Sequence, residues 1–394
     1  MLFPALRVLR RQMQLISDPL KLRAAAARVD AMGSRAGDVR IEPVNAETVP
    51  ATWVGVKGAR QDRVVMYLHG GAFITETPVF HTALLSRICR EARSRGLMVG
   101  YRLAPEHPYP AALDDCVTAY RWLLAQGQQA SRIIVAGDSA GGNLTLALIL
   151  RLRDEGLPLP AGAVALSPVA DLTFSGESVQ RNDGVDDMFS ADLLDALVPV
   201  YLSKRDQRKH PHVSPLFGDF AGMPPLLLIV GSTELLLDDS VRVAQRWPGA
   251  TLLVWDGMPH VFLGFDFLPE AREATRRVGR FIRDCFSAQT ASAGDVQEEA
   301  ETVPAAEAAP AHRAPTGRRR RLNVQTRLYL AVAVVSALAW LAVIVVGMGP
   351  WLLRVPAPVW TAAIALGAIW ALAVILFLRA TFGARRTPGG TSSE

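Results

Sequence analysis

The sequence predicts an α/β protein with a mostly parallel, doubly wound sheet. Between residues 41 and 286, short apolar runs of strand length alternate with longer helical stretches. This alternation is typical of parallel sheets covered by helices on both faces. In addition, a β-branched run leads directly into the small-residue turn Gly137-Asp138-Ser139-Ala140-Gly141, and a helical pattern follows at once. The order of strand, sharp turn and helix fits the same fold class.

The predicted elements alternate in order along this region. The strand candidates are residues 64–68, 98–101, 133–136, 163–166, 226–230 and 251–255. The helix candidates are residues 81–95, 111–126, 142–155, 235–247 and 269–286. Sheets of this kind carry their functional groups at the C-terminal ends of the strands.

The regions on either side of this domain differ from it in composition. Residues 1–40 have a helical pattern that is expected to stop near Met32-Gly33-Ser34. The N-terminus has no apolar stretch typical of a cleavable secretory signal. Residues 287–317 consist mostly of Ala, Glu, Pro, Thr and Ser. Such a stretch buries too little apolar surface to fold, so it is predicted to be a flexible linker.

Residues 318–394 predict a transmembrane hairpin. Residues 328–348 and 355–378 are apolar and uncharged, and each is long enough to cross a bilayer as a helix. Arginines flank the outer ends of both runs, while the short connection carries only Arg354. The positive-inside rule then places both termini and the preceding domain in the cytoplasm. The lipid bilayer is the expected partner, and anionic headgroups suit the run Arg318–Arg321. A pair of buried core helices is the alternative.

Composition excludes several other classes of function. The formal net charge is +5, and a good part of it lies beside the apolar C-terminal runs. The sequence has no basic patch with interleaved aromatic residues, which would suggest nucleic-acid binding. It also has no Cys/His spacing of the kind that holds a metal ion. The three cysteines, Cys89, Cys116 and Cys285, give no disulfide framework and are expected to be buried thiols.

Ser139 is the candidate nucleophile, because the tight turn presents its hydroxyl at the top of the sheet. A serine needs hydrogen-bond donors for the oxyanion that forms during attack. The small residues of His69-Gly70-Gly71-Ala72 directly follow the strand 64–68. The predicted oxyanion hole comprises the backbone N–H groups of Gly70, Gly71 and Ala72, completed by that of Ala140.

The serine also needs a base and an acid that orients the base. His260 follows the last predicted strand and lies in the order serine, acid, histidine, so it is the predicted base. Glu234 is the first carboxylate after the strand 226–230 and is the preferred acid. Asp238 is the alternative, although Asp238 and Asp239 both suit a helix cap or a charged surface.

Together these segments resemble the hormone-sensitive-lipase-like esterases of the α/β-hydrolase superfamily. The matching pieces, in family order, are His69-Gly70-Gly71-Ala72, Tyr101-Arg102-Leu103-Ala104-Pro105-Glu106-His107-Pro108-Tyr109-Pro110-Ala111-Ala112, Gly137-Asp138-Ser139-Ala140-Gly141-Gly142, Leu166-Ser167-Pro168 and Gly257-Met258-Pro259-His260-Val261-Phe262.

The resemblance implies an eight-stranded sheet with a helical cap drawn from residues 1–40 and 175–215. It also implies cofactor-free hydrolysis of short- or medium-chain carboxylic esters by Ser139, His260 and Glu234. The sequence departs from the family pattern at Ala72, where a third glycine is common, and at Glu234, where the acid is usually aspartate.

Other interpretations stay open at this point. A lactone hydrolase would use the same residues on a cyclic ester. A small-ligand-binding protein or a membrane scaffold could also be built on this fold. Related esterases often pair through their sheets, so a homodimer is one expectation, but the sequence leaves the oligomeric state undetermined.

Overall fold

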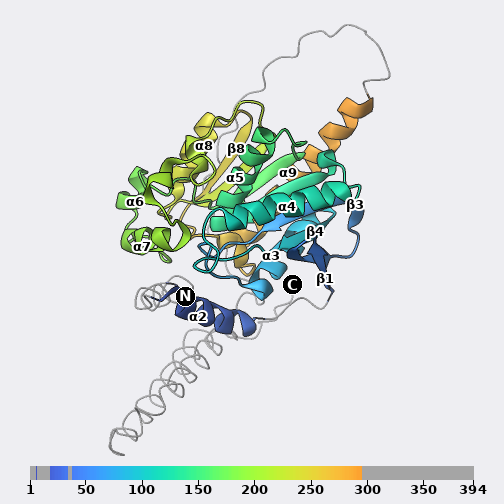
Figure 1. Ribbon diagram of the computed structural model, residues 1–394. Helices are drawn as coiled ribbons and strands as arrows, with labels where there is room; N and C mark the ends of the chain where they lie inside the picture. The colour runs from blue at the N-terminus through green and yellow to red at the C-terminus, as the bar shows by residue number, and fades with distance from the viewer. Residues whose placement is uncertain (1–5, 7–17, 34–37, 295–394) are drawn as a thin grey trace, which may run out of the picture. The chain divides into compact units, whose positions relative to one another are not determined.

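The computed structural model describes residue 6 and residues 18–33 and 38–294 (Figure 1). The predicted transmembrane hairpin and most of the predicted linker lie outside these residues. Within the described ranges, no helix is both long enough and apolar enough to cross a membrane.

A single eight-stranded sheet forms the centre of the described domain, with the strand order β1-β2-β4-β3-β5-β6-β7-β8. Strand β2 runs antiparallel to both β1 and β4, and the other neighbouring pairs are parallel. The strands are β1 (Arg40–Ala46), β2 (Val49–Gly55), β3 (Arg60–Leu68), β4 (Ser94–Val99), β5 (Ile133–Asp138), β6 (Gly162–Leu166), β7 (Leu226–Gly231) and β8 (Ala250–Trp255).

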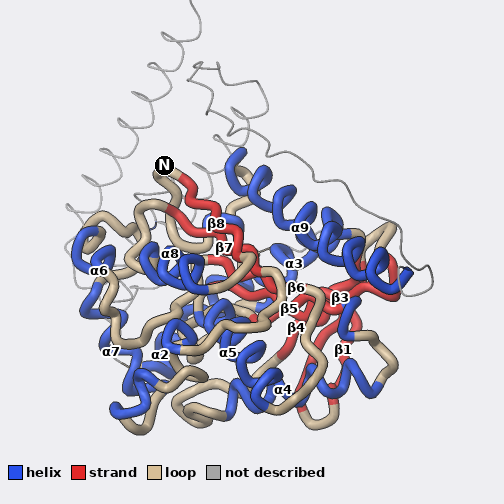
Figure 2. The backbone as a smooth tube through the Cα atoms, turned by 90° about the horizontal axis from the view of Figure 1, so that it is seen from above, coloured by secondary structure: helices blue, strands red, loops and turns tan. Residues whose placement is uncertain are grey.

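Helices cover both faces of this sheet (Figure 2). Helices α3 (Pro78–Ala92) and α9 (Pro269–Gly294) pack together on one face. Helices α4 (Ala111–Ala125), α5 (Ala140–Asp154) and α8 (Leu237–Arg246) lie on the other. Every residue of β5, β6 and β7 is buried, as expected for parallel strands covered on both faces.

The predicted strands correspond to β3 through β8, but the bounds of two strands are wrong. Strand β3 begins at Arg60 rather than at residue 64. Strand β4 begins at Ser94 rather than at residue 98, and the preceding helix ends at Ala92 rather than at residue 95. The helix stops there because Arg93 adopts a left-handed conformation with φ of 53°. Strands β1 and β2 were not among the strand candidates, since both are partly exposed and carry no continuous apolar run.

The cap is built from two separate parts of the chain. Helix α2 (Pro19–Ala31) ends beside the predicted stop at Met32. Helices α6 (Glu177–Arg181) and α7 (Ala191–Tyr201) come from the segment after β6. Arg23 of α2 donates to the carbonyl oxygens of Ile74 and Ala104, both at 2.7 Å. These bonds hold the N-terminal helix against the segments that follow β3 and β4.

Helix α9 extends beyond the predicted boundary of the domain. It continues to Gly294, whereas the sequence predicted a flexible linker from residue 287 onwards. The residues from 287 to 294 lack large aliphatic side chains, but they contain no proline that would stop a helix already begun.

Candidate active site

Ser139 lies in a strained turn between β5 and α5. Its φ of 55° and ψ of −119° are rare for a residue with a side chain, and such strain costs about 1–3 kcal/mol. The flanking glycines are required by close packing. A Cβ atom on Gly141 would lie 1.9 Å from the carbonyl oxygen of Leu68, and one on Gly137 would lie 2.3 Å from that of Gly141. The pattern of small residues around Ser139 therefore follows from the turn itself.

His260 and Glu234 are in direct contact, as the order of the chain predicted. His260 Nδ1 lies 2.8 Å from Glu234 Oε2, and the two side chains are only 3% and 0% exposed. Because a carboxylate only accepts, Nδ1 carries the proton and Nε2 of the neutral ring is free to act as a base. Burial by itself would lower the pKa of His260, but the hydrogen bond and the charge of Glu234 outweigh it and raise that pKa.

Ser167 connects these two residues, a role that the sequence analysis did not assign. It directly follows β6, and its hydroxyl donates to Glu234 Oε1 at 2.8 Å. The same hydroxyl accepts from the N–H of Val261 at 3.1 Å, next to His260. Its position after a buried parallel strand was the available signal, because such strand ends meet at one edge of the sheet.

The same strand end also supports the serine turn. The N–H of Ser139 donates to the carbonyl oxygen of Leu166 at 2.8 Å. The ends of β5, β6, β7 and β8 therefore bring the serine, the carboxylate and the imidazole to one edge of the sheet.

The alternative acid lies in a different environment. Asp238 accepts from the N–H of Ser178 at 2.8 Å and pairs with Arg181, so its carboxylate is turned toward the cap.

The expectation of a helix-cap or surface role for Asp239 is wrong. Asp239 is completely buried and accepts from the N–H groups of Ala170 and Asp171. Burial and the charge of Asp171 raise the pKa of Asp239 to about 8.

The predicted oxyanion loop contains one donor that is not free. The N–H of Gly70 donates to Asp138 Oδ1 at 3.1 Å, so including Gly70 in the oxyanion hole is wrong. Within the described residues, the N–H groups of Gly71 and Ala72 donate to no other group. Both have positive φ, 123° and 55°, and the N–H of Ala140 opens helix α5.

The side chain of Asp138 holds the predicted oxyanion loop in position. Besides Gly70, its buried carboxylate accepts from the hydroxyl of Tyr67 at 2.8 Å and lies 3.3 Å from His81 Nε2. Burial would raise the pKa of Asp138, but the charge and hydrogen bond of His81 lower it. His69 also holds the loop, because its ring stacks on Tyr101 and its Nδ1 lies 2.8 Å from the Gly70 carbonyl oxygen.

An apolar cavity of about 50 Å³ lies next to Ser139. Its walls come from the oxyanion loop, from the segment after β6 and from α7. The lining residues include Phe73, Val169, Phe174, Phe189, Leu194 and Tyr201. The ring of Phe189 also packs edge-on against His260, with ring centres 4.9 Å apart.

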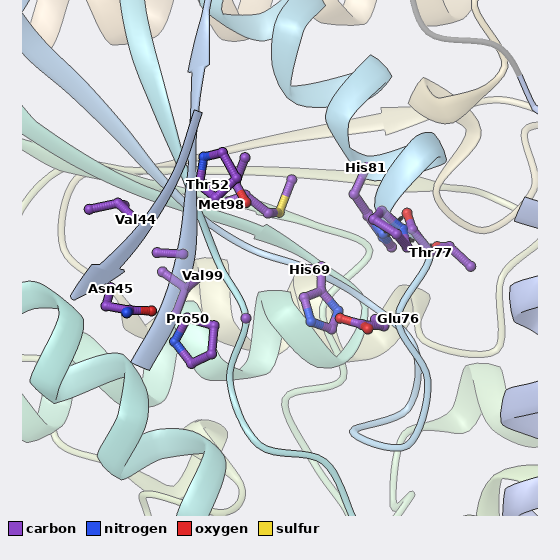
Figure 3. A pocket seen from close by; sticks show the side chains of 14 residues that line it. Val44, Asn45, Pro50, Thr52, His69, Glu76, Thr77, His81, Met98 and Val99 are labelled. Atoms are coloured by element: carbon purple, nitrogen blue, oxygen red, sulfur yellow. Dashed lines mark hydrogen bonds between the residues drawn. The ribbon is translucent and has the colours of Figure 1, made fainter. Parts of the chain in front are cut away.

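A larger cavity of about 370 Å³ lies away from the serine, the carboxylate and the imidazole. It lies between strands β1 and β2, the end of β4 and the start of α3. Figure 3 shows His69 and Glu76 among its lining residues. Ser139, Glu234 and His260 are not part of its lining. Size therefore does not identify the reactive site here, and the smaller cavity is the one beside the predicted nucleophile.

The described residues contain no group of three or more His, Cys, Asp or Glu side chains placed to hold a metal ion. All three cysteines are buried and free, which confirms the prediction made from their spacing.

Comparisons with known proteins agree with this architecture. A family model described as the alpha/beta hydrolase fold matches residues 65–264. An acetyl-hydrolase of Streptomyces hygroscopicus is 41% identical over 256 residues, which cover 63% of this chain and 85% of the relative. An esterase of Acinetobacter venetianus is 38% identical, and the matched region covers 59% of this chain and 80% of the esterase.

A solved structure extends the agreement to three dimensions. The crystal structure of an esterase from the bacterial hormone-sensitive lipase family is 38% identical and has a TM-score of 0.69. It covers 72% of this chain and 98% of its own. The chain belongs to the hormone-sensitive lipase family of serine carboxylesterases, which have the α/β-hydrolase fold.

Proposed function

We propose that this carboxylesterase hydrolyses short- to medium-chain esters through an acyl-enzyme formed on Ser139. The contact between His260 and Glu234, at the same sheet edge as the strained serine, is the observation that carries this proposal. The Ser139 oxygen attacks the ester carbonyl carbon, and His260 Nε2 takes the proton of the Ser139 hydroxyl at the same time. Glu234 orients the imidazole and stabilises the imidazolium that forms.

The backbone donors of Gly71, Ala72 and Ala140 stabilise the oxyanion of the tetrahedral intermediate in this mechanism. His260 then returns the proton to the departing alcohol, which leaves the acyl group on Ser139. Water, deprotonated by the same imidazole, attacks the acyl-enzyme and releases the carboxylic acid.

The cavity beside Ser139 supports a short acyl group. Its volume is about 50 Å³, against about 370 Å³ for the larger cavity, and its lining is largely apolar. Longer chains require the side chains of α7, such as Leu194, to move. Methyl- to propyl-sized acyl groups therefore fit the cavity better than long ones.

The experiment compares the wild-type chain with Ser139→Ala on p-nitrophenyl esters of increasing acyl length. Turnover of the acetate ester should fall by at least ~10³ in the variant, while the protein stays folded. In the wild type, kcat/KM should be highest for the short acyl groups. A Ser139→Ala variant that keeps its rate would refute the mechanism, and a rate that rises steadily up to long chains would refute the size limit.

A separate proposal concerns residues 318–394. The two uncharged runs and the flanking arginines support a membrane hairpin that tethers the esterase domain on the cytoplasmic side. After cell fractionation, the full chain should stay with membranes during alkaline carbonate extraction, and a chain ending at residue 317 should not. Release of the full chain by carbonate would count against the tether.

A further inference from the structure

The loop that carries Glu234 is bonded to a segment of the cap. We call residues 232–238 the acid loop and residues 178–189, between β6 and α7, the cap clip. Asn182 of the cap clip is buried, and its Nδ2 donates to the carbonyl oxygen of Glu234 at 2.7 Å and to that of Ser232 at 3.2 Å. The main chain of the acid residue itself is therefore held by a side chain of the cap.

Asp186 makes a second connection from the same segment. Its Oδ2 accepts from the N–H of Leu235, the residue after Glu234, at 2.9 Å. Its Oδ1 accepts from the N–H groups of Met188 and Phe189 at 2.7 and 3.0 Å. One buried carboxylate thus joins the acid loop to the turn that places the ring of Phe189 against His260.

Ser178 completes the set at the other end of the acid loop. Its hydroxyl donates to the carbonyl oxygen of Leu235 at 2.7 Å and accepts from the N–H of Asp238 at 3.0 Å. Buried backbone groups must find partners within the protein, and along the acid loop several of these partners belong to the cap clip.

The side chain and the main chain of Glu234 are therefore held by different parts of the fold. Its carboxylate is held at the sheet edge by the hydroxyl of Ser167 and by the N–H of Gly231. Its backbone is held by the cap clip, which continues directly into α7, a wall of the ester cavity.

We propose that Asn182 and Asp186 are positioning residues that make the contact between Glu234 and His260 depend on the cap. This inference rests on the proposed roles of Glu234 and His260. A cap that is displaced or badly packed would then slow the chemical step as well as weaken ester binding, because the carboxylate would lose its alignment with the imidazole.

The test uses Asn182→Leu in the full-length chain, measured with p-nitrophenyl acetate across the pH range. The substitution keeps a similar size and removes the donor to two carbonyl oxygens. We expect kcat to fall about tenfold to a hundredfold, with KM changed less than about threefold. The acid limb of the kcat/KM profile should move to lower pH, since His260 loses part of its interaction with Glu234.

The shift of the acid limb separates positioning from a purely structural role. The acidic groups that raise the pKa of His260 are Glu234, Asp186 and Asp138, and Asn182→Leu changes none of these charges. Loosening of the cap alone would raise KM or lower the melting temperature without moving the limb. An unchanged kcat, or a raised KM with an unmoved limb, would overturn the inference.

Two further variants keep the test decisive. If Asn182→Leu does not fold, Ser178→Ala tests the same connection, because it removes the cap-clip hydroxyl that bonds Leu235 and Asp238 and leaves every charge near His260 in place. Asp195→Asn is the matched control, since Asp195 lies on α7 and bonds Arg208 rather than the acid loop. Asp195→Asn should leave kcat and the acid limb of the kcat/KM profile unchanged. Glu234→Gln is run in parallel, and full activity there would refute the proposed acid rather than the role of the cap clip.

Discussion

Replacing Glu234 by aspartate, the usual acid of this family, should inactivate this enzyme almost as severely as removing the charge. The carboxylate of Glu234 is fully buried and has three partners: the N–H of Gly231 at 2.5 Å, the hydroxyl of Ser167 at 2.8 Å and His260 Nδ1 at 2.8 Å. Aspartate is one methylene shorter, so its oxygens would be withdrawn by about 1.5 Å. The distance to His260 would grow to about 4 Å, which is beyond a hydrogen bond.

The expected loss follows from what the carboxylate does for the imidazole. Without this partner the ring loses its orientation and the stabilisation of its charged form, which costs up to ~10⁴ in kcat for a triad acid. We expect kcat/KM to fall by ~10²–10⁴ in Glu234→Asp and by a similar factor in Glu234→Gln.

The pH profile provides a second measure of the same change. Glu234 raises the pKa of His260, and the base works only when it is neutral. Wild-type kcat/KM should therefore rise with pH through a value above 6.5, the ordinary pKa of histidine. In Glu234→Gln, the acid limb should move to lower pH because the charge that favours imidazolium is gone.

Asp238→Asn is the control, because Asp238 faces Ser178 and Arg181 rather than the imidazole, and the amide oxygen of asparagine can still accept from the N–H of Ser178. It should change kcat/KM by less than about threefold. The reasoning fails if Glu234→Asp keeps kcat/KM within about threefold of wild type, or if Asp238→Asn is the more damaging substitution.

Two further predictions concern buried groups near the site. Ser167→Ala removes the donor to Glu234 and should lower the free energy of unfolding by about 1–3 kcal/mol and kcat/KM by about tenfold; urea denaturation and kinetics on the acetate ester measure both, and two unchanged values would contradict the assigned contact. The pKa of Asp239 is raised in the folded protein from 3.8 to about 8, so the folded state keeps a proton that the unfolded state loses. Wild-type stability should therefore fall as pH rises between these values, and Asp239→Asn should lack this loss. Urea midpoints measured near pH 5 and pH 8.5 should differ less in the variant than in the wild type, and parallel pH dependences would contradict the prediction.

The pairing of Glu234 with His260 was predictable because it depends on features that lie close together in the chain. Each residue lies in the loop after a predicted strand, and the ends of neighbouring parallel strands meet at one edge of the sheet. The turn at Ser139 was equally readable, since its glycines are required by backbone contacts within the turn and with β3.

Other features of the site depend on partners that are distant in the chain. Gly70 looked like an oxyanion donor, but its N–H is taken by Asp138, a residue 68 positions away. Asp239 looked like a surface or cap residue, yet the segment after β6 covers it.

The amino-acid sequence alone determined the fold class, the strained serine turn and the order of the reactive residues, because periodicity and turn chemistry act over a few neighbouring residues. The tertiary structure decided which backbone donors stay free, how Ser167 links the carboxylate to the histidine loop and how the cap holds Glu234 in place. These contacts join segments that are far apart in the chain, and local patterns carry no information about which distant groups will meet.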